Sequence, residues 1–308
     1  MEIGGAKMRP TFFVRWRLAI EGGHHSQYDP TQLEHVIAEA AGVIRALGFA
    51  GKHVVLIGGI VPSLLIPVLD PALEPHVGTR DLDFCLSAAI VEGDTAEYER
   101  IERNLRQAGF EATDESWRWR GGDTGNVLVE FFCPANDERP AGKLFRPAHH
   151  ENPLARHNLG RTLSALALEM GGFIDQDVQI IEREMDLPRG QGRMTVSMRV
   201  IGPAGFLALK ASALNGRRKP KDAYDIIWLL DAWEGGPEGI AGYVRERSFY
   251  LSSDFGHVID ILADQFRDVG HAGAIAYADF VTVELEDRDI HARHAVDGVQ
   301  QFLRRVRQ

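Results

Sequence analysis

The chain has 308 residues, of which 44% are hydrophobic and 25% are charged. These values are ordinary for a globular protein and exclude a largely disordered chain. The formal net charge of -10 argues against general nucleic-acid binding, which depends on neutralising phosphates, although it leaves room for a local basic patch.

Cysteine usage and the N-terminus indicate where the protein resides. Cys85 and Cys133 stand in separate apolar runs and form no CxxC pair, so neither a zinc ribbon nor a disulfide scaffold is expected. The N-terminus has no basic region followed by an apolar core, and no run reaches the roughly 18 apolar residues that span a bilayer. We therefore expect a cytoplasmic protein without a signal peptide or membrane segment.

The first 140 or so residues mix helices and strands. A helix is predicted over residues 30–47, because Asp29 is a suitable N-cap, Gln32 completes a capping box, and apolar residues recur on one face until Gly48. Gly58-Gly59 then joins a buried strand to a further helix. Period-two and apolar runs predict strands over residues 53–57, 81–86, 117–120 and 127–132, and a helical pattern covers residues 95–108.

The second half is expected to be mainly helical. Strands are predicted over residues 178–184 and 194–200, and the pattern is helical from Pro203 to the end. Pro, His and Asn gather in residues 134–158, where we place a linker. The predicted fold class is α+β (mixed α/β), with an α/β sheet domain over residues 1–145 and a mainly helical domain over residues 146–308 that completes a cleft.

The sharpest local feature is the segment of residues 79–84, TRDLDF. On a strand, Asp81 and Asp83 project to one side, whereas Leu82 and Phe84 face a core. Two adjacent carboxylates repel each other unless a cation lies between them, and Mg²⁺ prefers carboxylate oxygens together with substrate phosphates. The alternative is a pair of acids on a solvent-facing strand.

Two other features favour a phosphate-binding site. Gly58-Gly59 ends a strand and opens a helix, a turn that directs backbone N–H groups and a positive helix end at an anion. Without side chains, these glycines let a phosphate approach the backbone. Glu130 interrupts the apolar run of residues 127–132, and an acid there is costly to bury without a partner such as a metal. The alternative is an edge strand with Glu130 facing water.

The glycine turn, the Asp-x-Asp strand and the later acid resemble the nucleotidyltransferase fold of polymerase-beta-like enzymes. The C-terminal half narrows the resemblance. Residues 207–214, LALKASAL, precede residues 217–226, RRKPKDAYDI, and together they look like the lysine helix and Lys-x-x-Asp-type helix of the AbiEii-like nucleotidyltransferases. That family includes toxins of type IV toxin–antitoxin and abortive-infection systems. The resemblance covers roughly residues 50–235, and where the family usually has a small polar residue after the glycines, this chain has Ile60.

Elementary chemistry leaves alternatives open for the C-terminal residues. Lys210 lies in an apolar helix stripe, so it either extends to water or meets a fixed anion such as a nucleotide phosphate. Asp222 can simply complement the dipole of its helix, whereas Asp225 lies deeper among apolar neighbours. Lys221 and Asp225 can also form an i, i+4 ion pair that contributes little if it is exposed.

The resemblance implies a metal-dependent nucleotidyltransferase that moves a nucleoside monophosphate from an NTP onto tRNA or a protein. Mg²⁺ or Mn²⁺ would be held by Asp81, Asp83 and Glu130, and Lys210 would join these acids as a catalytic residue. The nucleotide would be bound by Gly58, Gly59, Thr79, Lys210, Lys221, Asp222 and Asp225. A toxin role would add an antitoxin protein as a partner.

The rival interpretation is a nucleotide-binding or interaction module that keeps the fold and has lost the chemistry. The two differ in whether Glu130 converges on Asp81 and Asp83. A DNA-reading antitoxin is not favoured, because the sequence shows no helix-turn-helix motif.

Three remaining features are ambiguous. Residues 117–120, WRWR, either stack nucleic-acid bases or form a half-buried hairpin strand. The basic run of residues 217–221 either contacts phosphates or is a solvated loop. The histidine pairs at residues 24–25, 149–150 and 291/294 lack a second, correctly spaced ligand pair, so no metal site is expected at them.

Overall fold

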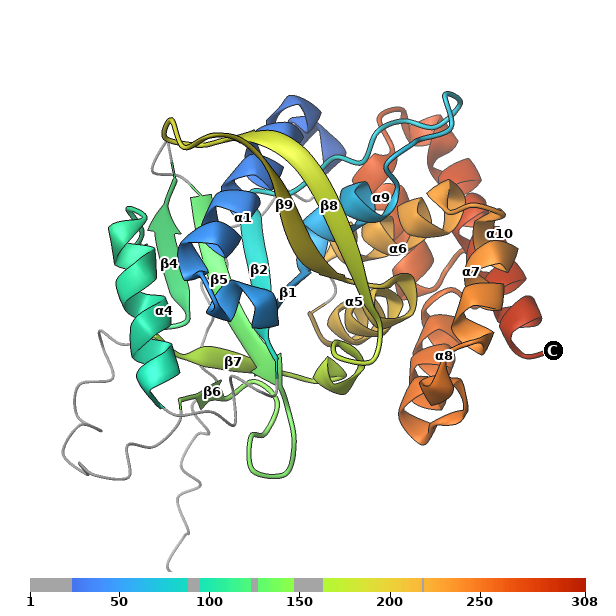
Figure 1. Cartoon of the computed structure of the whole chain (residues 1–308). Coiled ribbons are helices and arrows are strands. Elements are labelled where there is room, and N and C mark those ends of the chain that lie inside the picture. The colour runs from blue at the N-terminus through green and yellow to red at the C-terminus, as the bar shows by residue number, and fades with distance from the viewer. Residues whose placement is uncertain (1–23, 88–94, 123–126, 147–162, 218) are drawn as a thin grey trace, which may run out of the picture.

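A mixed β-sheet forms the centre of the structure, a computed structural model that describes residues 24–87, 95–122, 127–146, 163–217 and 219–308 (Figure 1). The strand order is β3-β4-β5-β2-β1-β9-β8, and β7 joins β5 and pairs in turn with β6. The strands are β1 (Val54–Ile57), β2 (Asp81–Leu86), β3 (Glu111–Ala112), β4 (Arg118–Gly121), β5 (Val127–Pro134), β6 (Leu144–Phe145), β7 (Ala165–Leu168), β8 (Val178–Leu187) and β9 (Gly192–Ile201).

Strands β2 and β5 lie at the middle of this sheet and are parallel to each other. β1 runs antiparallel to β2 on one side, and β4 runs antiparallel to β5 on the other. The apolar side chains of β1 and β2 and most of those of β5 are buried, as expected for strands that have neighbours on both edges. A polar side chain on these strands therefore needs a specific partner.

Helices cover the sheet and form a separate layer at one end of it. α1 (Leu33–Leu47) lies across the sheet in contact with β2, β8 and β9, beside α4 (Thr95–Gln107). The short α2 (Val61–Leu65) follows the glycine turn after β1. Figure 1 shows the C-terminal helices gathered together beyond β1, β9 and β8. They are α5 (Pro203–Arg217), α6 (Pro220–Ala232), α7 (Gly236–Arg245), α8 (Ser253–Gln265), α9 (Ala272–Val281) and α10 (Arg288–Val306).

The expected α+β class is confirmed: a mixed sheet precedes a mainly helical C-terminal region. Each strand and long helix predicted from the sequence is present with shifted ends. The first helix begins at Leu33, because Asp29 accepts hydrogen bonds from Thr31 and so caps a 3₁₀ turn over Pro30–Gln32 instead of the helix itself. The strands β3, β6 and β7 were not predicted; two of them contain only two residues.

The change from sheet to helices lies later in the chain than the predicted boundary near residue 145. β8 and β9 form a long hairpin, and β9 joins β1 in parallel, with Leu56 opposite Val200. β7 likewise joins β5. A division that follows the sheet would fall between Ile201 and Pro203, and the division into two domains stays a prediction. Among the described helices, none combines the length and apolar character needed to cross a bilayer.

Candidate functional site

The acidic side of the candidate site lies on two neighbouring central strands. Asp81 and Asp83 are on β2, and Glu130 on β5 stands directly opposite Asp83. Residues paired in this way across neighbouring strands share one face of the sheet, so the three carboxyl groups project to the same side. Because β5 is an inner strand and Glu130 is only 9% exposed, the alternative in which this acid faces water from an edge strand is wrong.

The glycine turn lies between this acidic side and the C-terminal helices. Gly58 has φ = +77°, and a β-carbon on it would come within 1.8 Å of Oδ2 of Asp83. A side chain there would therefore strain the backbone and displace the carboxylate. A β-carbon on Gly59 would come within 2.8 Å of Nζ of Lys221 and 3.1 Å of Cβ of Thr79. Thr79 also accepts a hydrogen bond from the backbone N–H of Asp81 (3.3 Å).

Glu130 is bonded to an arginine that the sequence patterns did not assign to the site. Arg118 on β4 is paired with Glu130 across the sheet. Its Nε donates to Oε1 of Glu130 at 2.5 Å, and its Nη1 donates to Oε2 of Glu115 at 2.5 Å. Burial and the negative charge of Asp83 raise the pKa of Glu130 to about 8, although Arg118 acts in the opposite direction. Glu130 thus converges on Asp83, and the guanidinium group of Arg118 already contacts Glu130.

The donor chemistry on this side suits a hard divalent cation. Asp81 and Asp83 provide carboxylate oxygens on one face of β2, and Mg²⁺ is commonly held by one or two carboxylates plus substrate phosphates. Within the described ranges, no three His, Cys, Asp or Glu side chains lie together as a complete metal site. Asp81 and Asp83 therefore offer the carboxylate oxygens that such a cation would take, together with ligands from outside the protein.

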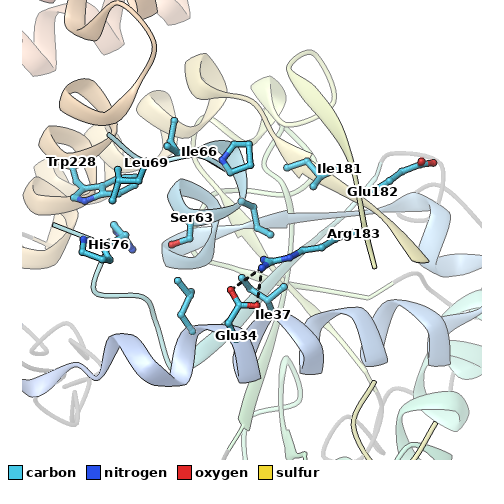
Figure 2. Close-up of a pocket in the computed structure, with 14 residues that line it drawn as sticks. Glu34, Ile37, Ser63, Ile66, Leu69, His76, Ile181, Glu182, Arg183 and Trp228 are labelled. Carbon is cyan, nitrogen blue, oxygen red and sulfur yellow. Dashed lines mark hydrogen bonds and ion pairs between the residues drawn. The ribbon is translucent and has the colours of Figure 1, made fainter. Parts of the chain in front are cut away.

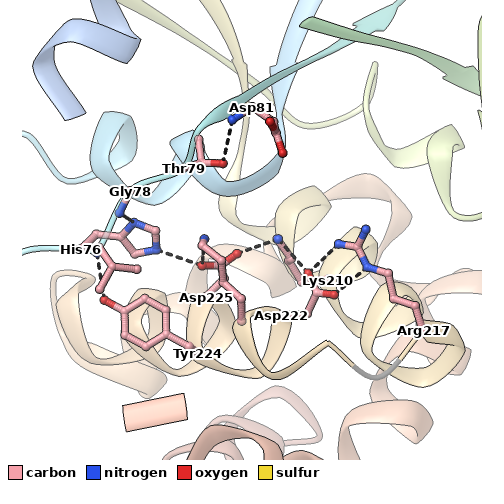
Figure 3. Close-up of polar contacts among 11 residues, drawn as sticks. His76, Gly78, Thr79, Asp81, Lys210, Arg217, Asp222, Tyr224 and Asp225 are labelled. Atoms are coloured by element: carbon pink, nitrogen blue, oxygen red, sulfur yellow. Dashed lines mark hydrogen bonds and ion pairs between the residues drawn. The ribbon is translucent and has the colours of Figure 1, made fainter. Parts of the chain in front are cut away.

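A largely buried group of charged side chains, with Arg217 at its exposed edge, links α5 and α6 (Figure 3). Nζ of Lys210 lies 2.9 Å from Oδ1 of Asp222 and 2.6 Å from Oδ2 of Asp225. Nζ of Lys221 lies 2.7 Å from Oδ1 of Asp225, and Arg217 donates twice to Asp222 at 2.8 Å. We call these five residues the cationic cluster, because three cations meet two carboxylates and leave an excess of one positive charge.

Burial distinguishes between the alternatives left open for these residues. Lys210 is 7% exposed and Asp225 is 0% exposed, so Lys210 does not extend to water; the fixed anions that it meets are Asp222 and Asp225. The i, i+4 pair of Lys221 and Asp225 is likewise buried rather than exposed. Asp222 does more than complement a helix dipole, since both of its oxygens accept bonds from cations.

Burial and ion pairing shift the pKa values of the cluster in different directions. Burial opposes the charge on Lys210, but Asp222 and Asp225 outweigh it and raise the pKa of Lys210. Burial also opposes the charge on Asp225, and the two lysines overcome it, so its pKa falls well below the usual range. Burial lowers the pKa of Lys221, against the attraction of Asp225. Lys221, which lies against Gly59, is thus the lysine of the cluster that loses its proton more readily.

His76 is a second residue that no sequence pattern singled out. It is 2% exposed, and its Nε2 lies 3.0 Å from Oδ1 of Asp225, across 149 positions of the chain. Burial lowers the pKa of His76 to about 4, so the ring is neutral at physiological pH. Its only sequence signal is its position five residues before Asp81, which does not reveal a contact with a distant helix.

Two of the features that were ambiguous in the sequence, the WRWR segment and the histidines at residues 24 and 294, belong to the scaffold, whereas Arg217 and Lys221 of the basic run belong to the cationic cluster. Trp119 is fully buried and Trp117 is 4% exposed, so the half-buried hairpin interpretation holds and these rings are not free to stack bases. His24 bonds to the carbonyl of Thr282, and His294 to Asp231. Arg218, His149 and His150 lie outside the described residues.

A cavity of about 390 Å³ lies between α1, α2, β8 and α6 (Figure 2). Its walls are mainly apolar, with Ile37, Leu69 and Trp228 among them, and the exposed ion pair of Glu34 and Arg183 (2.8 Å) borders it. None of the site residues predicted from the sequence lines this cavity, although His76 does. The cavity is therefore distinct from the space between the acids and the cationic cluster.

Comparisons with known proteins give a structural likeness and no match of sequence. No protein-family model matches the sequence, and no curated protein matches it. Among solved structures, the chain is similar to the crystal structure of an antigenic nucleotidyltransferase-like protein from Paracoccidioides brasiliensis, with 14% sequence identity and a TM-score of 0.41. The match covers 79% of this chain and 92% of that chain. A likeness at this level assigns neither activity nor substrate.

Proposed function

We propose that the protein is a metal-dependent nucleotidyltransferase. The observation that carries this proposal is the placement of the glycine turn: Gly58 lies against Asp83, and Gly59 lies against Lys221 of the cationic cluster. A metal–nucleotide complex needs carboxylates for its cation and cations for its remaining phosphate charge. Both are present on opposite sides of a turn that has no side chains to obstruct phosphate.

The chain's own residues have distinct tasks in this reaction. Asp81 and Asp83 hold a divalent metal, Mg²⁺ or Mn²⁺, which would supply electrostatic stabilisation to the phosphate oxygens. Gly58, Gly59 and Thr79 shape the phosphate path. Lys221 lies nearest to that path and neutralises phosphate charge. Lys210, Asp222 and Asp225 hold Lys221 in place.

Glu130 is the proposed proton acceptor. An acceptor hydroxyl attacks the α-phosphorus of the NTP, its oxygen forms the new P–O bond, and the bond to the leaving pyrophosphate breaks. The hydroxyl proton passes to the carboxylate of Glu130. Neutralising the charge of Asp83 removes its contribution to the raised pKa of Glu130, and thereby favours the ionised base.

The acceptor class follows from the resemblance rather than from the geometry. The AbiEii-like pattern favours tRNA or a protein as acceptor, in a toxin that an antitoxin protein would counteract. The net charge of -10 makes broad nucleic-acid affinity unfavourable, so an RNA acceptor would have to bind through a local surface.

The second candidate function is a nucleotide-binding module without chemistry. One observation favours it: the carboxylate of Glu130 is bonded to Arg118 at 2.5 Å, and a base that stays bound to an arginine cannot readily accept a proton. The two functions predict the same nucleotide binding and opposite results for transfer.

The experiment is transfer of label from each of four α-³²P-labelled NTPs, with Mg²⁺ or Mn²⁺, into total tRNA and into protein. Wild type is compared with Asp83→Asn and with the control Asp70→Asn, which removes an exposed loop carboxylate away from the site. Label with wild type and the control but not with Asp83→Asn supports the enzyme. Binding of nucleotide in calorimetry without label in either fraction would support the second candidate, and label that survives in Asp83→Asn would refute the site.

A further inference from the structure

His76 makes two hydrogen bonds that fix its protonation state. The backbone N–H of Gly78 donates to Nδ1 at 3.0 Å, so the ring proton must reside on Nε2. Nε2 then donates to Oδ1 of Asp225 at 3.0 Å. Because burial keeps the ring neutral, the histidine is one donor and one acceptor, each with one partner.

The segment that carries His76 is tied to α6 by three side chains of that helix. Besides Asp225, the hydroxyl of Tyr224 accepts from the backbone N–H of Val77 at 3.1 Å. Nε1 of Trp228 donates to the carbonyl of Glu74 at 2.9 Å. Figure 3 shows the first two ties side by side. This segment leads directly into Thr79 and Asp81, so α6 is connected to the acidic side of the site.

His76 and Lys221 share one oxygen of Asp225. Oδ1 accepts from His76 at 3.0 Å and from Lys221 at 2.7 Å, while Oδ2 lies 2.6 Å from Lys210. A carboxylate with partners on both oxygens has little freedom to rotate. Removing the bond from His76 leaves Oδ1 with the lysine alone, and the lysine can then follow the carboxylate away from Gly59.

We propose that His76 is a positioning residue that fixes the carboxylate of Asp225 and, through it, the ammonium group of Lys221 against the glycine turn. This inference rests on the proposed function, because it assigns Lys221 to the phosphate path. It adds a coupling between the two halves of the site: the loop that delivers Asp81 also sets the position of the lysine on the other side of the nucleotide.

Two polar variants separate the two bonds of His76. In His76→Asn the side-chain oxygen can replace Nδ1 as acceptor for Gly78, but the shorter side chain does not reach Asp225. In His76→Gln the longer side chain carries an N–H donor close to the position of Nε2. The matched control is His294→Asn, since His294 also bonds an aspartate of α6, Asp231, at 2.7 Å but is half exposed and remote from the glycine turn.

The kinetic arm compares KM for the NTP with kcat. We expect His76→Asn to raise KM roughly tenfold with a smaller change in kcat, the order of effect for losing one hydrogen bond to a buried charged group. His76→Gln should restore KM to within about threefold of wild type, and His294→Asn should leave it unchanged. Equal KM values for His76→Asn and wild type would overturn the inference.

A second arm does not depend on activity. Lysines of the full-length variants are labelled with acetic anhydride, and the rates at Lys221 are read by mass spectrometry against exposed Lys143. We expect several-fold faster labelling of Lys221 in His76→Asn, and wild-type rates in His76→Gln and His294→Asn. If wild type transfers no label from any NTP, the proposed function fails, and this arm still decides whether His76 positions the lysine; unchanged labelling of Lys221 in His76→Asn would refute that role.

Discussion

The two sides of the candidate site are built in opposite ways. On the sheet, Asp81 and Asp83 are partly exposed, and Glu130 has a raised pKa because it is buried and the carboxyl group of Asp83 lies beside it. In the helices, the members of the cationic cluster are already paired, and both of its carboxylates are buried. The acidic side thus brings like charges together at the surface of the sheet, whereas the basic side is a preorganised set of ion pairs. Under the proposed function, a metal would offset the charge of the acidic side when the nucleotide binds.

The largest effect is expected at the acidic side. Replacing Asp83 with Asn removes a proposed metal ligand without changing its shape, so transfer should fall by about 100-fold or more. The fold should persist, because one of two repelling charges has been removed. Single-turnover transfer and thermal unfolding check this together. A variant that is inactive because it is unfolded would not support the assignment.

The basic side should respond in stability as well as activity. Asp225→Asn leaves Lys210 and Lys221 buried with one fewer counter-charge, and breaking a buried pair in this way destabilises by about 3–5 kcal/mol. Urea unfolding measures the change. The matched control is Asp231→Asn, on the same helix, whose partner His294 is half exposed and whose loss should have a much smaller effect. Similar stability of the two variants would show that the cationic cluster is not the preorganised side of the site.

The glycine turn allows a sharper comparison. Gly58→Ala and Gly48→Ala both place a side chain at positive φ, +77° and +61°, and the backbone strain alone should cost each about 1–3 kcal/mol of stability. Gly48 has no atom within 4 Å of the added carbon, whereas Gly58 meets the carboxylate of Asp83. Only Gly58→Ala should therefore reduce transfer. Equal activity in both variants would mean that Asp83 does not need its observed position.

The remaining effect concerns the pH dependence of stability. The pKa of Glu130 in the folded protein, about 8, lies above its ordinary value of 4.5. Wild type should therefore lose stability relative to Glu130→Gln as pH rises from about 5 to about 9. Denaturant midpoints at both pH values measure it without added metal. Glu115→Gln, which removes the half-exposed partner of Arg118, is the control, and a constant difference between wild type and Glu130→Gln would contradict the raised pKa of Glu130.

What the sequence predicted depended on how local the signal was. The common face of Asp81 and Asp83 follows from strand periodicity alone, and the glycine turn follows from two adjacent residues. The bond between Arg118 and Glu130 depends on the register of a hairpin, and the bond between His76 and Asp225 joins residues 149 positions apart. Such pairings form only when the chain folds, so no spacing of residues in the sequence predicts them.

The position of β8 and β9 in the sheet could not be predicted for a related reason. The hairpin of β8 and β9 is recognisable from its alternation, and both strands were predicted. Its parallel pairing with β1, where Leu56 meets Val200, joins segments that are distant in sequence. The predicted domain boundary near residue 145 therefore rested on amino-acid composition, whereas the extent of the sheet is determined by tertiary packing.

The most direct test of this account is the metal dependence of nucleotide affinity, measured by calorimetry with each NTP in Mg²⁺ and in EDTA. Wild type should bind at least about tenfold more tightly with Mg²⁺, because the acids repel a bare triphosphate. The double variant Asp81→Asn, Asp83→Asn should bind equally with and without Mg²⁺, since the repulsion has gone and the cationic cluster remains. Metal-independent binding by wild type would contradict the division into an acidic side that needs a cation and a basic side that does not.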